Sequence, residues 1–140
     1  MPWTLQTIHP LFVHFPIALF STGLFIDILS RLWKNYEEEL DSVGLWIMGA
    51  ALLSSSLTTL TGIIAYIKQG TFSHLLNFNH GILAMLSIII FSLLFWVRIE
   101  FQLDLRYSII KRNVYLFIQI LSTSILFYAA HLGAIAAERI

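Results

Sequence analysis

Four long stretches without a charged residue constrain the fold of this chain more than any other feature. They cover residues 1–26, 42–67, 69–97 and 113–137. A helix needs about 20 apolar residues, each rising about 1.5 Å, to cross the hydrocarbon core of a bilayer. Each stretch is long enough to do so. We therefore predict membrane-spanning helices near residues 10–33, 43–67, 78–98 and 112–137.

The composition agrees with a membrane protein and excludes several other classes. Hydrophobic residues make up 58% of the chain and charged residues 11%, against about 45–50% and about 25% in soluble domains. A formal net charge of zero leaves no basic surface to bind nucleic acid. Because the chain has no cysteine, it lacks disulfides, thiolate metal sites and the CxxCH motif that attaches c-type haem.

Short connections join the four predicted spans, so consecutive helices run in opposite directions. The sequence thus predicts an all-α integral membrane protein, a four-helix up-down-up-down bundle that forms a single domain over residues 1–140. The last connection, residues 99–111, alternates between apolar and charged positions. Such a pattern is typical of a short amphipathic segment at a membrane surface. The first span lacks a signal-peptide cleavage pattern and is expected to remain as a helix.

Lysine and arginine are distributed unequally between the two predicted sides of the membrane. Two of the eight fall on the side of the chain termini and six on the other side. The positive-inside rule then places both termini outside. In a bacterium, this is a multi-pass protein of the inner membrane with both ends in the periplasm.

All five histidines are expected at one end of the bundle, although they are scattered along the sequence. They are His9 and His14 at the start of the first span, His74 and His80 around the start of the third, and His131 near the end of the fourth. An odd-numbered span starts where an even-numbered span ends, so these positions share the outer end. The three histidines His14, His80 and His131 lie about four, three and six residues in from the ends of their spans, so at about 1.5 Å per residue they are nearly level, roughly 4 to 9 Å inside. Ionisable residues at membrane depth indicate function.

Neutral imidazole is a ligand for haem iron and for other transition metals. Small residues near His131, among them Ala129 and Gly133, make room for a flat haem. A copper or zinc site would favour an acidic or methionine ligand beside the histidines, and only Glu138 and Met1 are expected at this end. We therefore predict one haem b with axial ligands drawn from His14, His80 and His131; five histidines also suffice for a second haem.

Two alternatives remain open at this stage. The first is a protein that binds or transports a metal ion, with copper, zinc or iron held by the same three histidines. The second is a structural or assembly membrane protein without a cofactor, in which the histidines make hydrogen bonds between helices.

Other polar residues in the spans receive simpler interpretations. Asp27 is expected to reach interfacial water or a neighbouring polar group, and Gln119 to form hydrogen bonds between helices. The hydroxyl groups between Ser54 and Thr61 are expected to bond mostly to carbonyls of their own helix.

The segment HPLFVHFPIA at residues 9–18 resembles the opening of the small membrane proteins grouped as domain of unknown function 2231. That family continues with a Thr-Gly near the end of the second span, a His opening the third and a Gly-rich end to the fourth. Thr61-Gly62, His80 and AHLGAIAAE at 130–138 stand in these places. Some relatives are fused to cytochrome c-like modules and end the fourth span with His-Gly-Gly, which His131-Leu132-Gly133 resembles, although Ala134 departs from it.

The resemblance implies a redox association and supports four histidines as the functional positions: His9, His14, His80 and His131. Together with the haem prediction, it leads us to expect a b-type cytochrome-like electron-transfer protein, an oxidoreductase component rather than a hydrolytic enzyme. Its expected partners are membrane lipid and either quinol or a small periplasmic cytochrome.

Overall fold

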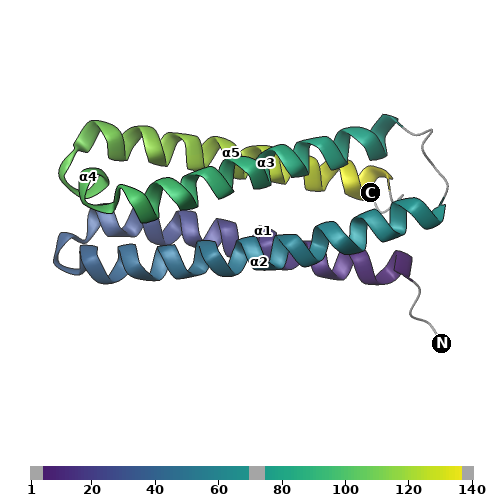
Figure 1. Cartoon of the computed structure of the whole chain (residues 1–140), viewed down its shortest axis with the longest axis horizontal. Helices are drawn as coiled ribbons and strands as arrows, with labels where there is room; N and C mark the ends of the chain where they lie inside the picture. The colour runs from purple at the N-terminus through teal and green to yellow at the C-terminus, as the bar shows by residue number, and fades with distance from the viewer. Residues whose placement is uncertain (1–4, 70–74, 137–140) are drawn as a thin grey trace.

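The computed structural model describes residues 5–69 and 75–136 and consists of helices. Four long helices are α1 (Leu5–Leu32), α2 (Glu37–Gln69), α3 (Leu75–Glu100) and α5 (Ile109–Ala136). They run alternately in opposite directions (Figure 1). The predicted all-α, up-down-up-down bundle is confirmed.

Two short elements form the turns at one end of this bundle. A 3₁₀ turn, η1 (Lys34–Tyr36), joins α1 to α2, and a six-residue helix, α4 (Gln102–Tyr107), joins α3 to α5. The α4 helix occupies the connection that was predicted to be amphipathic. The first turn of α2 carries three glutamates, Glu37 to Glu39, and their charge complements the positive end of the helix dipole.

A segment long and apolar enough to cross a membrane runs along each long helix, and the second of these segments begins in η1. These segments are Phe12–Leu32, Lys34–Ile64, Asn79–Glu100 and Ile109–Ile135. Large apolar side chains point outward along them; Trp46 is 78% exposed and Leu53 is 73% exposed. A surface this apolar is suited to contact with lipid rather than with water.

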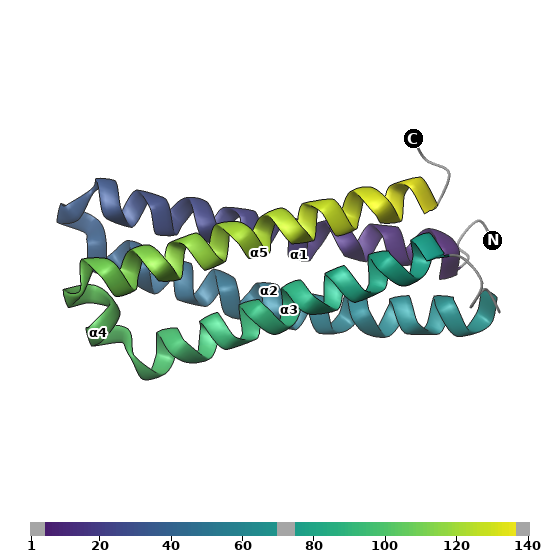
Figure 2. The same ribbon diagram turned by 90° about the horizontal axis from the view of Figure 1, so that it is seen from above.

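The bundle is built from two pairs of helices that pack closely. The α1 helix packs mainly on α2, and α3 packs mainly on α5. Figure 1 shows the two pairs as two layers, and Figure 2 shows the same bundle turned by 90°. The rings of Phe20 and Phe91 stack across the core between α1 and α3, with centroids 3.7 Å apart. This stack, together with Met48 and Ala51 of α2, forms the buried centre of the bundle.

Candidate functional site

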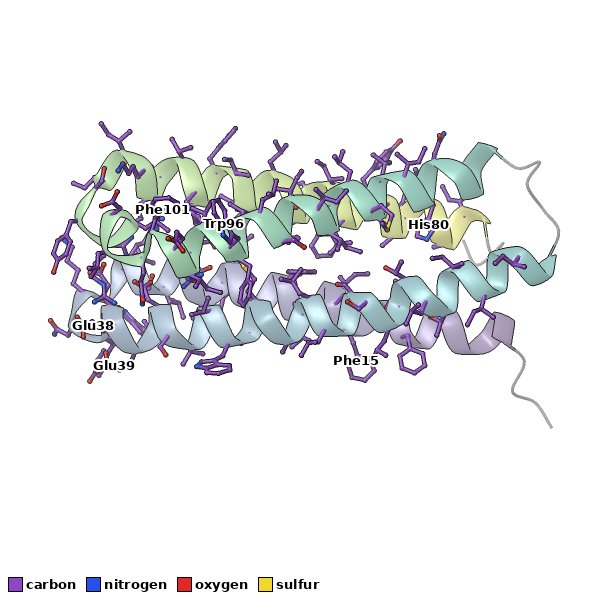
Figure 3. The ribbon with its side chains drawn as sticks, in the orientation of Figure 1. Phe15, Glu38, Glu39, His80, Trp96 and Phe101 are labelled. Atoms are coloured by element: carbon purple, nitrogen blue, oxygen red, sulfur yellow. The ribbon has the colours of Figure 1, made fainter. Side chains whose placement is uncertain are left out.

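The two ends of the bundle differ in their polar residues. We call one the histidine end, where α1 and α3 begin and α2 and α5 end; His80 lies there in Figure 3. We call the other the arginine end, which holds Arg31, Arg98 and Arg112. Glu38 and Glu39 mark that end in Figure 3.

At the histidine end, the ring of His80 is fixed between α3 and α5. Its Nδ1 atom lies 2.6 Å from the backbone oxygen of Ala129. A carbonyl oxygen only accepts, so Nδ1 carries the hydrogen and donates it. In the neutral ring, Nε2 then keeps its lone pair, which is the state that binds a metal or haem iron.

The close approach of His80 to α5 depends on small residues of that helix. A Cβ atom on Gly133 would stand 2.8 Å from Cε1 and 2.9 Å from Nδ1 of the ring. Ala129, one turn earlier, is completely buried. Ala129 and Gly133, which were expected to make room for a haem, therefore accommodate His80 itself.

The described side chains of His14 and His131 differ from that of His80 in being exposed. His131 is exposed; it lies two residues from both Ala129 and Gly133, so it points away from the α3–α5 contact. His14 is exposed on α1. His74 and the side chain of His9 lie outside the described part of the chain.

A regular register between α1 and α3 nevertheless relates His9 to His80. The contact between Asp27 and Arg98 joins residues 71 apart in the sequence, and Phe20 and Phe91 are separated by the same interval. These two helices run parallel, so the same interval, continued to the histidine end, predicts that the backbone of His9 lies near the level of His80.

Within residues 5–69 and 75–136, the described side chains include no group of three His, Cys, Asp or Glu residues that could hold one metal ion. A site with three protein ligands is the usual minimum for a bare zinc or copper ion. A haem needs only one or two axial histidines.

The hydroxyl groups of α2 behave largely as expected. Ser55 and Ser56 donate to the backbone oxygens of Ala51 and Leu52 in their own helix. Thr58 also contacts the backbone oxygen of Phe12 in α1, at 3.1 Å. Of these three groups, only Thr58 links α2 to α1.

The arginine end holds a buried ion pair between Asp27 and Arg98, which was not among the sequence-based expectations. Both oxygens of Asp27 accept from Arg98, at 2.8 Å from Nη1 and 2.7 Å from Nη2. Asp27 is 5% exposed and Arg98 7% exposed. The two-pronged geometry suits a guanidinium and a carboxylate, and it links α1 to α3.

The other two long helices, α5 and α2, contribute further hydrogen bonds to this ion pair. Gln119 of α5, which is fully buried, donates from Nε2 to Asp27 at 2.7 Å. Arg98 also donates to the backbone oxygen of Asp41 in α2 at 2.8 Å. The Asp27 interaction with a polar neighbour and the interhelical role of Gln119 are thus confirmed, with Arg98 as the central partner.

A glycine of α2 makes room for the pair. A Cβ on Gly44 would come within 2.9 Å of Arg98 Nη2 and closer still to an oxygen of Asp27. The positions of the two charges in the sequence could have predicted this ion pair. Asp27 ends the first uncharged stretch and Arg98 ends the third, so parallel spans bring opposite charges to one end.

Comparison with known protein families identifies a family that matches nearly the whole chain. The model of a family described as a predicted membrane protein (DUF2231) matches residues 5–140. The chain belongs to the DUF2231 family. This membership agrees with the four helices that are apolar enough to span a membrane. No curated protein and no solved structure matches the sequence of this DUF2231 member.

Proposed function

We propose that this DUF2231 protein is a b-type cytochrome-like electron-transfer component that binds haem at the histidine end. The hydrogen bond from His80 Nδ1 to the Ala129 backbone carries this proposal, because it orients the ring and leaves Nε2 as a ligand. A haem supplies a one-electron carrier, and one axial histidine is enough to bind it.

The remaining histidines supply candidates for a second axial ligand. His9 is favoured because the register of α1 and α3, continued to the histidine end, predicts its backbone near the level of His80. His14 and His131, both exposed at the same end, stay candidates. An edge-exposed haem in this position would be accessible to quinol in the membrane or to a small cytochrome.

The distribution of lysine and arginine supports an orientation for the proposed site. The arginine end carries most of the positive charge, so the positive-inside rule places it on the cytoplasmic side of a bacterial inner membrane. The histidine end and the haem would then face the periplasm. A single haem at one end does not carry electrons across the membrane.

The decisive test is an absorption spectrum of the detergent-purified protein, made with ample haem, oxidised and then reduced with dithionite. We expect a Soret band and sharp reduced α and β bands, with about one haem per chain in a pyridine haemochrome assay. The variant His80→Gln keeps an amide that can donate to Ala129 but removes the ligand, so it should fold and lose the bands. His74→Gln is the matched histidine control.

A featureless spectrum of the wild-type protein would overturn the haem proposal. Metal analysis of the same sample would then separate a metal-binding protein from one without a cofactor. Retention of the full spectrum in His80→Gln would remove His80 as the axial ligand.

A further inference from the structure

A proline interrupts the backbone hydrogen bonds of α1 near the histidine end. The helix runs through Pro16 without a break, and Pro16 is buried. Proline has no N–H group, so the backbone oxygen of Phe12, four residues earlier, loses the donor that a helix normally supplies. The hydrocarbon core of a membrane offers no donor in its place. Prolines in membrane helices are therefore tolerated where another group of the protein bonds to the freed oxygen.

A hydroxyl group of α2 supplies this donor. Thr58 Oγ1 lies 3.1 Å from the backbone oxygen of Phe12 and 3.0 Å from that of Ser54 in its own helix. The hydroxyl carries one hydrogen, so the two oxygens share it. Two serines of α2, by contrast, donate to backbone oxygens of their own helix. The hydroxyl bond from α2 to α1 thus meets the oxygen that Pro16 leaves without a backbone donor.

The bonded oxygen belongs to the part of α1 that carries two histidines. Phe12 lies between His9 and His14 in the sequence. The bond from Thr58 therefore ties this part of α1 to α2 where α1 has lost one of its own hydrogen bonds. At the same end, the His80 ring is held by its bond to a backbone oxygen of α5. Each of the two closely packed helix pairs thus has one side-chain bond to a backbone oxygen beside its histidines.

We propose that Thr58 is a positioning residue for the second axial ligand of the haem, and that it acts through the oxygen freed by Pro16. This inference rests on the proposed function. Without the hydroxyl, the start of α1 would continue into the rest of the helix across a turn that lacks one hydrogen bond, and it would move more freely relative to α2. A histidine of α1 shares an iron with His80 only if the distance between them stays constant.

A double-mutant cycle on the full-length protein tests the link between Thr58 and Pro16, and it does not depend on a cofactor. Thr58→Val removes the hydroxyl at nearly constant volume, and Pro16→Ala returns an N–H group that donates to Phe12. With Pro16 in place, we expect Thr58→Val to raise the unfolding equilibrium constant about three- to tenfold in mixed micelles of SDS and a neutral detergent. In the Pro16→Ala background, the same change should raise it less than about twofold.

Two further variants serve as controls for this cycle. Thr58→Ser keeps a hydroxyl and should restore most of the stability that Thr58→Val loses. Thr123→Val removes a buried hydroxyl that bonds to Gln119 in its own helix, and its effect should be the same in both backgrounds. An effect of Thr58→Val that is equal with and without Pro16, or absent from both, would overturn the inference. If Pro16→Ala does not fold, equal stability of Thr58→Val and Thr58→Ser would overturn it.

The haem gives the readout that separates positioning from stability. Two axial histidines give a low-spin iron, and a poorly held second ligand leaves part of it high-spin. We expect folded Thr58→Val to show a larger high-spin fraction than the wild type in the electron paramagnetic resonance spectrum of the oxidised protein. Thr58→Ser and Thr123→Val should keep the wild-type spectrum. An unchanged spectrum in Thr58→Val would leave Thr58 as a stabilising contact and overturn its positioning role.

The two measurements also separate this inference from the proposed function. Wild-type protein without haem would overturn the proposed function and the positioning role together. A positive unfolding cycle in that case would show that the link between Thr58 and Pro16 is correct and that the haem assignment is wrong.

Discussion

The ring of His80 lies against the backbone of Gly133, at a distance that leaves no space for a side chain on residue 133. The contact joins the start of α3 to the end of α5, and the hydrogen bond to Ala129 sets the rotation of the ring. A histidine held in this way keeps one ring orientation, as the proposed role of an axial ligand requires.

Replacing Gly133 by Ala should displace the His80 ring. The added Cβ would stand 2.8 Å from Cε1, and overpacking of this kind costs about 1–3 kcal/mol. We expect a loss of that size in the free energy of unfolding, measured in mixed micelles of SDS and a neutral detergent. The haem content per chain, if the proposed function holds, should fall with it.

Gly81→Ala is the matched control, because a Cβ there would have no atom within 4 Å. It should leave the stability unchanged or raise it by up to about 1 kcal/mol, since alanine favours a helix over glycine. Equal losses in the two variants would contradict tight packing of His80 on Gly133.

Gly44→Ala should break the buried ion pair at the arginine end. Its Cβ would clash with both Asp27 and Arg98, and separating a buried pair costs about 3–5 kcal/mol. In Gly49→Ala, on the same helix, the Cβ would meet Phe95 at an ordinary 3.5 Å. We expect that control to change the free energy of unfolding by less than about 1 kcal/mol, and a similar small change in Gly44→Ala would show that the pair can shift.

A double-mutant cycle should reveal strong coupling between Asp27 and Arg98. Asp27→Leu leaves a buried guanidinium unpaired, and Arg98→Met leaves a buried carboxylate, so each should lose about 3–5 kcal/mol of stability. The double variant removes both charges and should lose less than the sum of the two single losses. Additive losses in the unfolding assay would mean that the two groups do not depend on each other.

Ser87→Ala tests a second polar contact inside the bundle. Ser87 and Ser122 are fully buried, and the Ser87 hydroxyl donates to the backbone oxygen of Ser122 at 2.9 Å. Hydrogen bonds between membrane helices contribute about 0.6 kcal/mol on average, and we expect a loss near that value. Ser92→Ala, whose hydroxyl bonds to its own helix at Ile88, should lose less. A larger loss in the control would place the stabilisation outside the α3–α5 contact.

The number and direction of the helices were accessible from the sequence because one strong physical signal determines them. A charge-free stretch of sufficient length can be recognised as a span without knowledge of the helices it packs against. The order of the spans then determines which residues share an end of the bundle. That reasoning brought His14, His80 and His131 to one end of the bundle.

The rotation of each helix about its own axis could not be predicted from the sequence in the same way. His80 turns toward Ala129, whereas His131 and His14 turn outward, because packing against neighbouring helices decides which face is buried. The Asp27–Arg98 pair escaped prediction for a related reason. Each residue, taken alone, fits the boundary of a membrane span. They become partners because both lie at the same end of the bundle and because their helices are rotated so that the two side chains face each other.

The ion pair also has a consequence for the biogenesis of the protein. Asp27 belongs to the hairpin of α1 and α2, and Arg98 belongs to the hairpin of α3 and α5, so the two-pronged ion pair forms only when the two hairpins dock. A chain that stops after α2 carries an acidic group with no basic partner from α3, which is costly at membrane depth. Docking of the second hairpin supplies the Arg98 partner and so offsets this cost.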